Sequence, residues 1–333
     1  MFDHYVAVDW ALSNMAIAKM TKVSNKITVV DVPSNLKEFK LYLAKLKGSI
    51  ILTFEETTTS RWLYTELHDC VDRILVCDPY RNKLLSEGAK TDKIDAEKLV
   101  KLLKADFLKE VFHTNNDFIE IRKIVSAYED LIKAGVRLKN QRSALFRAKN
   151  KNHKLETTLD NFAEKFVLEG IDKNIKSYEK EKLRYLSEFK RLKKKHKEIK
   201  LISEIPGIGE ITAVQVVSRV VDASRFKKRN HFLSYCGLIR HSRISGGKTY
   251  GKKTPRFCRM MKGIIKIATT STMKGNNEFF HKYNYLIMEK NYSARDARTS
   301  VARQIATVVY AVLKNKSKYD PFKNRKINYV TTI

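Results

Sequence analysis

The sequence predicts an α/β domain at the N-terminus, a long helical middle segment and a mainly α C-terminal part. Three observations predict this organisation. Short β-branched apolar runs alternate with helical periods in the first third of the chain, apolar positions repeat at threes and fours from Ile121, and a Pro-Gly-Ile-Gly turn at 206–209 separates two apolar helical runs. We therefore divide the chain into residues 1–112, 113–200 and 201–333.

The first segment has a definite order of expected elements. Strands are expected at 5–11, 16–21, 26–32, 49–54 and 73–77, and helices at 35–47, at 60–71 and from Asp92 onward. This β-β-β-α-β-α-β-α order is that of the ribonuclease-H-like fold. Buried strands with short connections between them and the helices fit an α/β layer architecture.

Acidic residues stand at three places in this order. Asp9 lies in the first strand, Glu55 and Glu56 end the fourth strand, and Asp92 and Asp95 are three residues apart where the last helix starts. Residues at i and i+3 share a helix face, so both aspartates can point at one spot. Acids also favour the first turn of any helix because of its dipole, but their convergence with acids on two strands favours a metal site. Four carboxylates can hold one or two Mg²⁺ ions for phosphodiester chemistry.

The charge of the chain limits the classes of partner that it can bind. The formal net charge is +30, from 66 basic and 36 acidic residues. Residues 1–121 carry 17 basic and 18 acidic side chains, residues 122–200 carry 23 and 11, and residues 201–333 carry 26 and 7. We expect the two basic segments to bind a polyanion, with nucleic acid favoured over an anionic membrane because no long apolar run or amphipathic anchor is present.

The cysteines and the N-terminus predict the compartment. Cys70, Cys77, Cys236 and Cys258 show no C-x-x-C spacing, and the histidines do not cluster with them, which argues against a zinc site. Reduced thiols and the lack of a basic-then-apolar leader predict a soluble protein of the cytoplasm.

The middle segment, 113–200, predicts a basic antiparallel coiled coil: a long helical hairpin formed within one chain or with a second protomer. Its two heptad-like runs are Ile121, Ile124, Tyr128, Leu131, Gly135, Leu138 and Leu145, then Tyr178, Tyr185, Leu192 and Ile199. A shorter helical piece is expected at 155–167. The basic run 190–197, which includes Lys193 and Lys194, favours a nucleic-acid surface over a merely solvated face.

Two glycine motifs mark the C-terminal part. The 206–209 turn has a helix-hairpin-helix pattern, in which Gly207 and Gly209 would let backbone N–H groups face a phosphate, although a tight turn between core helices fits equally well. The second motif is Ser245-Gly246-Gly247, which by itself is most often a hairpin turn. Basic residues surround this motif: Arg243, Lys248, Lys252 and Lys253, followed by Arg256 in an expected basic helix. Their positive charges would lower the cost of forming a serine alkoxide and would bind a phosphate.

The acidic blocks resemble those of a known family. Val-Ala-Val-Asp9, Glu55-Glu56-Thr57 and Lys90-Thr91-Asp92-x-x-Asp95-Ala96 look like the three blocks of the DEDD transposases. These are RuvC-like recombinases of bacterial insertion sequences, a group that includes pilin-gene invertases and bridge-RNA-guided recombinases. The resemblance implies that Asp9, Glu55, Asp92 and Asp95 form a magnesium-binding tetrad. The family usually reads Glu-x-Thr-Gly where this chain reads Glu55-Glu56-Thr57-Thr58, and the threonine spacing favours Glu55 over Glu56.

The resemblance continues through the glycine motifs and implies a reaction. By that match Ser245, with Ser242 as the weaker alternative, is the nucleophile that forms a covalent link to DNA, acting from a different protomer than the tetrad it meets. The implied partners are double-stranded target and donor DNA, further copies of the chain in a dimer or tetramer, and a structured non-coding (bridge) RNA as guide. The resemblance also implies a bacterial protein associated with the nucleoid.

Other functions compete with that of a site-specific recombinase. A junction-resolving or structure-specific nuclease of the same fold would use water instead of a serine, and a DNA invertase would share the recombinase chemistry. A non-catalytic nucleic-acid-binding protein would not need Asp92. An actin-like sugar kinase would need glycine-rich phosphate loops, which this sequence does not contain.

Overall fold

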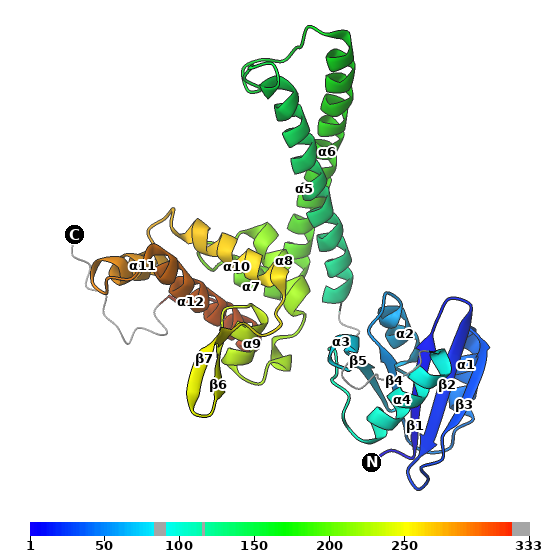
Figure 1. Ribbon diagram of the computed structural model, residues 1–333. Helices are drawn as coiled ribbons and strands as arrows, with labels where there is room; N and C mark the ends of the chain where they lie inside the picture. Colours follow the sequence, from blue (N-terminus) through cyan, green and yellow to red (C-terminus); the bar gives the residue numbers. More distant parts are fainter. Residues whose placement is uncertain (83–90, 115–116, 322–333) are drawn as a thin grey trace. The chain divides into compact units, whose positions relative to one another are not determined.

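The chain forms two compact units, Met1–Asn115 and Asn116–Ile333. The structure is a computed structural model that describes residues 1–82, 91–114 and 117–321 (Figure 1). Lys90, the first residue of the third acidic block, lies outside the described residues.

The first unit is built on a five-stranded mixed sheet with the strand order β3-β2-β1-β4-β5. Its strands are β1 (His4–Trp10), β2 (Asn14–Thr21), β3 (Thr28–Pro33), β4 (Ile50–Glu55) and β5 (Arg73–Cys77). The first three strands form an antiparallel meander, whereas β1, β4 and β5 run parallel. This topology is consistent with the ribonuclease-H-like fold that the sequence predicts.

Helices cover both faces of this sheet. On one face α1 (Leu36–Ala44) and α2 (Ser60–Leu67) pack on the even-numbered residues of β1, and on the other face α4 (Asp92–Lys104) packs on the odd-numbered ones. A short helix that the sequence did not indicate, α3 (Pro79–Asn82), follows β5. The helix expected at 60–71 ends at Leu67, and β3 starts two residues later than expected.

The second unit begins with the antiparallel pair α5 (Phe118–Arg147) and α6 (Phe162–Lys195). The rings of Tyr128 and Phe189 meet edge to face with centroids 5.0 Å apart. Farther along the pair, the ring of Tyr178 fills the space that a β-carbon on Gly135 would occupy. The pairing is the predicted helical hairpin, within one chain.

Two details of the predicted hairpin differ from the structure. No separate helix forms at 155–167: a loop connects the two helices and α6 begins at Phe162. The second apolar run does not continue to Ile199 on one helix, because the extended backbone of His196 (φ −112°, ψ 115°) ends α6 and starts α7 (Lys197–Ser203).

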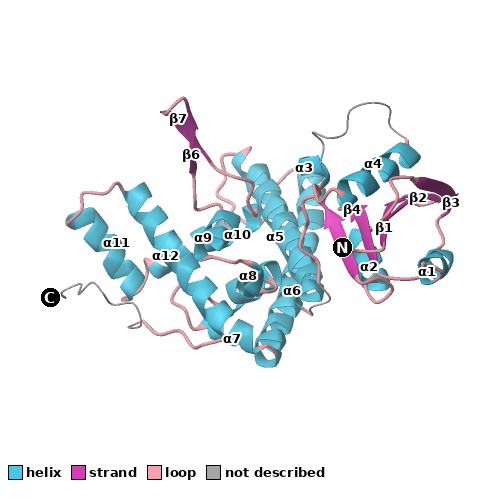
Figure 2. Ribbon diagram, turned by 90° about the horizontal axis from the view of Figure 1, so that it is seen from below, coloured by secondary structure: helices cyan, strands magenta, loops and turns pink. Residues whose placement is uncertain are grey.

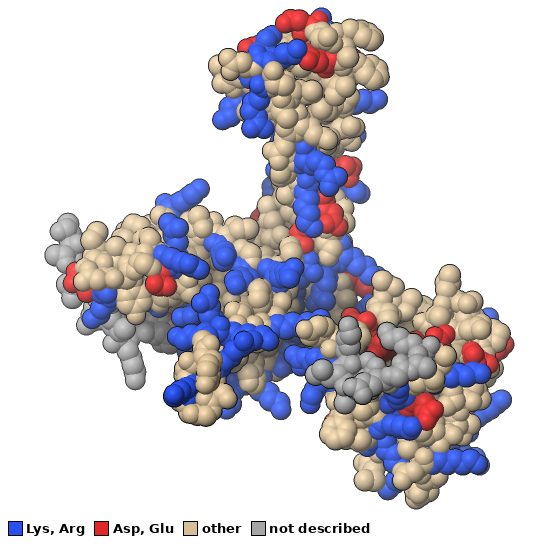
Figure 3. Space-filling view, viewed as in Figure 1, with Lys and Arg blue, Asp and Glu red and all other residues tan. Residues whose placement is uncertain are grey.

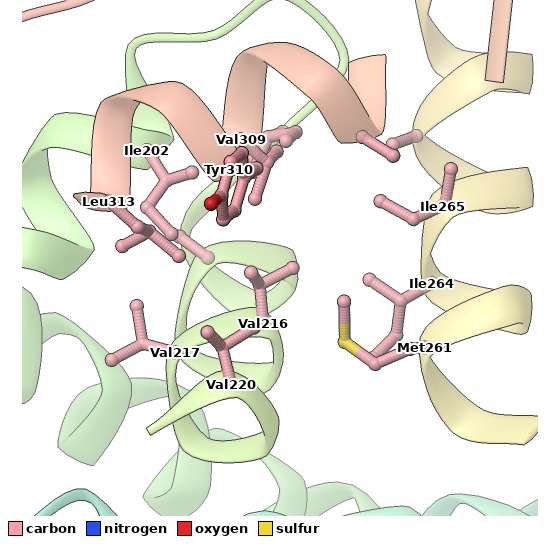
Figure 4. Packing of buried hydrophobic residues seen from close by; sticks show 14 of the residues in the cluster. Ile202, Val216, Val217, Val220, Met261, Ile264, Ile265, Val309, Tyr310 and Leu313 are labelled. Carbon is pink, nitrogen blue, oxygen red and sulfur yellow. The ribbon is translucent and has the colours of Figure 1, made fainter. Parts of the chain in front are cut away.

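One apolar core unites the remaining helices with the base of the hairpin. These helices are α7, α8 (Glu210–Val220), α9 (Arg229–Tyr235), α10 (Arg259–Thr272), α11 (Glu278–Met288) and α12 (Ala294–Asn315), with a short 3₁₀ turn, η2 (Ala223–Arg225). Figure 4 shows side chains of α8, α10 and α12 interdigitating in this core, among them Val216, Met261, Ile264 and Tyr310. The unit is mainly helical, as predicted.

The only sheet described in the second unit is a two-stranded hairpin, β6 (His241–Ser245) and β7 (Lys248–Lys253). Every residue of both strands is exposed, and the hairpin projects from the helices (Figure 2). In the part of the chain that the structure describes, no helix is both long enough and apolar enough to cross a membrane.

Candidate active site

Asp9 and Glu55 lie at the ends of two neighbouring parallel strands, on the sheet face covered by α4. In β1, Ala7 packs in the same apolar cluster as α4, and in β4, Ile51 does so. Residues two apart along a strand share a face, so Asp9 and Glu55 continue these rows. The register pairs Ala7 with Thr53, which sets Asp9 and Glu55 at the same level two residues farther on.

Asp92 and Asp95 occupy the first turn of α4. The side chain of Thr91 caps this helix by accepting a hydrogen bond from the backbone N–H of Ile94 at 3.3 Å. Asp92 precedes the buried Ala96 by four residues, and Asp95 precedes the buried Leu99 by four. Because positions four apart share a helix face, both carboxylates lie on the stripe that faces the sheet.

The electrostatics of Asp9 show that these acids are near one another. Partial burial raises the pKa of the Asp9 carboxyl above its ordinary value, and the negative charges of Asp92 and Asp95 raise it further. No neighbouring cation among the described residues opposes this rise. A divalent cation would relieve the repulsion, and carboxylate oxygens are ligands that Mg²⁺ accepts.

The acids are not arranged as a finished ligand cage. Within the described ranges, no group of three or more His, Cys, Asp or Glu side chains is placed to hold a metal ion. Asp9, Asp92 and Asp95 therefore lie within electrostatic reach of each other but not at the spacing of metal ligands. Their chemistry and mutual repulsion fit a cation, and binding one would require the carboxylates to come closer together.

Glu56 faces the other way from Glu55. Its Oε2 accepts a hydrogen bond from the Ser60 hydroxyl at 3.1 Å and lies 2.5 Å from Nε2 of His113. Ser60 is the first residue of α2, and the ring of His113 lies against that of Tyr64 in the same helix. Glu56 thus belongs to the α2 face of the sheet.

The contact of His113 is one that the sequence did not reveal. The segment before it pairs with the edge of β5: Val111 N–H donates to the Val76 carbonyl at 2.8 Å, and Asp78 N–H donates to the Lys109 carbonyl at 2.9 Å. His113 and Glu56 are 57 positions apart and form no motif. Only the folded path of the segment after α4 brings them together.

Ser245 is the last residue of β6, at the tip of the exposed hairpin. Gly246 and Gly247 follow it with φ values of 54° and 74°, the left-handed conformations that a two-residue turn requires and that favour glycine. Ser245 pairs with Lys248 and Ser242 pairs with Lys252. The sequence SGG therefore forms a hairpin turn that presents Ser245 to solvent.

Basic side chains surround this serine. Arg243, Lys248, Lys252 and Lys253 are exposed along the two strands. On the face shown in Figure 3, Lys and Arg side chains gather over this hairpin and the adjoining helices. Arg256 follows in the loop before α10 rather than in the helix, which begins at Arg259. A phosphate beside Ser245 would meet several cations.

The glycines of the 206–209 turn serve two different purposes. Gly207 has a φ of +82°, and a β-carbon there would lie 2.5 Å from the carbonyl oxygen of Ala268, so close packing on α10 requires glycine. Gly209 is the N-cap of α8, and nothing lies within 4 Å of where its β-carbon would be. The first glycine is explained by core packing, and the second leaves the start of α8 open.

The two lysines predicted on the basic run differ in their surroundings. Lys193 is half-buried and its Nζ lies 3.3 Å from Oε1 of Glu210, at the start of α8. Lys194 is exposed. An ion pair within the protein therefore neutralises part of the positive charge of this run.

Two family models match the chain. One, described as a transposase of the IS110 DEDD type, matches residues 6–150, which include all four predicted acids. The other, described as the transposase of the IS116/IS110/IS902 family, matches residues 199–284, which include the 206–209 turn and Ser245. Together they cover more than two thirds of the sequence. Among curated proteins, none matches the chain.

Proposed function

The chain belongs to the IS116/IS110/IS902 family of transposases and is a DNA transposase or recombinase, and from this premise we propose how it acts. It cuts and rejoins DNA at specific sites with Ser245 as nucleophile and magnesium held by Asp9, Glu55, Asp92 and Asp95. The observation that supports the proposal most is the raised pKa of Asp9, which comes first from its partial burial and then from the nearby negative charges of Asp92 and Asp95.

The first unit supplies the acidic site. Asp9 and Glu55 approach from two strands and Asp92 and Asp95 from the helix that covers them. When bound, Mg²⁺ would lower the charge of a phosphodiester and of its leaving oxygen. Because Asp9 and Glu55 lie on strands and Asp92 and Asp95 on one helical turn, the backbone positions the carboxylates that would hold the ion.

The second unit supplies the nucleophile. The hydroxyl oxygen of Ser245 forms a bond to phosphorus as the bond from phosphorus to one sugar oxygen breaks, which gives a phosphoserine and a free DNA hydroxyl. Attack by the hydroxyl of another DNA end reverses these changes, releases Ser245 and rejoins the strand. Arg243, Lys248 and Lys252 are the exposed cations that bind the phosphate during both steps.

The two parts of the site belong to different units of the fold. We propose that Ser245 serves the acids of another protomer in a dimer or tetramer, and that the α5–α6 pair acts as a coiled coil in that assembly. Mixing two inactive variants, Asp92→Asn and Ser245→Ala, tests this. Restored strand transfer, with the DNA attached to the Asp92→Asn copy, is expected; no restoration contradicts exchange between protomers.

The basic surface is proposed to hold nucleic acid. Residues 122–333 carry 49 basic and 18 acidic side chains, a surplus that supports a structured guide RNA as well as target and donor DNA. The open start of α8 at Gly209 would offer backbone N–H groups to a phosphate, as in a helix-hairpin-helix motif. Because its substrate is DNA, we propose that the protein acts in the cytoplasm, at the nucleoid.

The serine mechanism is tested by comparing Ser245→Ala with its neighbour Ser242→Ala. We expect Ser245→Ala to abolish covalent protein–DNA adducts and strand transfer, and Ser242→Ala to retain both, as seen on denaturing gels with labelled DNA. DNA cleavage that survives in Ser245→Ala would instead indicate a nuclease that uses water.

A further inference from the structure

We propose that His113 is a positioning residue that fixes the metal ligand Glu55 through its neighbour Glu56. The inference rests on the proposed role of Glu55 as a ligand. It concerns a pair of side chains on the α2 face of the sheet, opposite the face where Asp9 and the α4 aspartates lie.

Glu56 is held by three separate contacts. Its Oε2 lies 2.5 Å from Nε2 of His113, whose N–H donates because an ionised carboxylate can only accept. The Ser60 hydroxyl donates to the same oxygen at 3.1 Å. The backbone N–H of Glu56 donates to the carbonyl of Cys77 at 2.9 Å, which extends the β4–β5 ladder past Glu55. The residue after Glu55 is thus held by both its backbone and its side chain.

His113 is itself held firmly enough to act as an anchor. Its side chain is only 9% exposed, although its partner Glu56 is 40% exposed. Its ring lies against that of Tyr64, with centroids 5.3 Å apart. The next residue is held too, because the guanidinium of Arg61 in α2 donates to the carbonyl of Thr114. This largely buried imidazole therefore meets the carboxylate of Glu56 in a fixed place.

The geometry explains how this pair reaches the acidic site. Successive residues of an extended strand point to opposite faces, so fixing the Glu56 side chain on one face fixes the direction of Glu55 on the other. A ligand carboxylate must be held within about 0.5 Å to be productive. β4 ends at Glu55, and the next residue continues the ladder through its N–H bond to the Cys77 carbonyl. The His113–Glu56 pair adds a side-chain contact on the α2 face, which supports Glu55 without occupying the metal face.

Manganese binding to the full-length protein without DNA tests the proposal, with calorimetry as a readout that is independent of catalysis. Outer partners of metal ligands typically change affinity about 10–100-fold. We expect His113→Leu and Glu56→Ala each to weaken Mn²⁺ binding by about that factor, and the double variant to be no weaker than either, because both remove one interaction. His113→Gln, which keeps a donor for Glu56, should restore most of the affinity.

Two controls separate this inference from the proposed function and from a mere loss of stability. His68→Leu removes a histidine of the same unit that pairs with Asp69 and should leave Mn²⁺ affinity unchanged. Glu55→Gln should reduce Mn²⁺ affinity at least as much as His113→Leu. Raising Mn²⁺ should recover the DNA cleavage rate of His113→Leu, since the loss lies in metal affinity and not in the fold.

Two outcomes would overturn the proposal in distinguishable ways. Wild-type Mn²⁺ affinity in both His113→Leu and Glu56→Ala, beside a weakened Glu55→Gln, would sink the positioning role and leave the proposed function standing. Unchanged affinity in Glu55→Gln would remove the ligand role on which both rest. Glu56→Ala, at a side chain that is 40% exposed, keeps the test decisive if His113→Leu does not fold.

Discussion

At the scale of single residues, the alternation of a strand decides which of two adjacent glutamates can reach the other acids. Glu55 continues the row of Ile51 toward α4, whereas Glu56 turns to Ser60 and His113. This parity could not have been worked out from the sequence, because every residue of β4 before Glu55 is buried and the run has no alternation that marks one face. The partner His113 could not have been found either, since no local pattern links residues so far apart in the chain.

The raised pKa of Asp9 predicts a pH-dependent effect on stability. Above that pKa the carboxylate is charged in both the folded and the unfolded state. Its burial, and its repulsion by Asp92 and Asp95, then impose a free-energy penalty on the folded state alone. Below the ordinary pKa of an aspartate, both states are protonated and the penalty is lost. In metal-free buffer, Asp9→Asn should therefore raise the free energy of unfolding by about 0.5–2 kcal/mol at neutral pH.

Urea unfolding at several pH values measures this effect. The gain from Asp9→Asn should shrink as the pH falls through the raised pKa of Asp9 and vanish in acid. Added Mg²⁺ should stabilise the natural protein but not the variant. A gain that persists unchanged at low pH would mean that the repulsion among the acids is not its cause.

At the scale of elements, the strand order was predictable because each strand is a short apolar run with a clear end. The helical hairpin was predictable from its repeat of apolar residues. The break at His196 was not, because the repeat runs past it to Ile199, and only the extended backbone at His196 separates the two helices. The hairpin turn at 246–247 follows from two successive glycines with positive φ.

Gly135 and Gly170, both inside the helical hairpin, should respond in opposite ways to alanine. A β-carbon at Gly135 would overlap the Tyr178 ring, so Gly135→Ala should destabilise the unit by about 1–3 kcal/mol. Nothing lies within 4 Å of the corresponding position at Gly170, where alanine should stabilise the helix by about 0.5–1 kcal/mol. Equal changes in stability for the two variants, measured by thermal unfolding, would contradict the packing of Tyr178 on Gly135.

The turn before α8 offers a second matched pair. Gly207→Ala combines a positive φ with contact on Ala268, and should cost about 1–3 kcal/mol of stability. Gly209→Ala should leave stability nearly unchanged. If the open start of α8 holds a phosphate, Gly209→Ala should still weaken DNA binding, as measured by fluorescence anisotropy. DNA affinity equal to that of the natural protein would show that this turn does not contact DNA.

At the scale of the whole molecule, the two units differ in net charge and in the site residues that they carry. The nearly neutral first unit carries the acids, and the basic second unit carries Ser245 and the exposed cations of its hairpin. Nucleic-acid affinity should therefore depend steeply on salt and mainly on the second unit.

A triple change of Lys248, Lys252 and Lys253 to Gln should show this dependence. The slope of the logarithm of the DNA affinity against the logarithm of salt should fall by about 0.9 for each lost phosphate contact. The matched control changes Lys37, Lys45 and Lys47, exposed lysines of the first unit, in the same way. Equal slopes for both triple variants would place DNA elsewhere than on the hairpin.

The central claim is that carboxylates of one unit and a serine of the other carry out one reaction. Mass spectrometry of peptides from protein trapped with its DNA tests it most directly. We predict a nucleotide linked through phosphate to Ser245, formed with Mg²⁺ and absent both with chelator and in Asp92→Asn. DNA cut in the presence of Mg²⁺ with no phosphate on Ser245 would contradict the account.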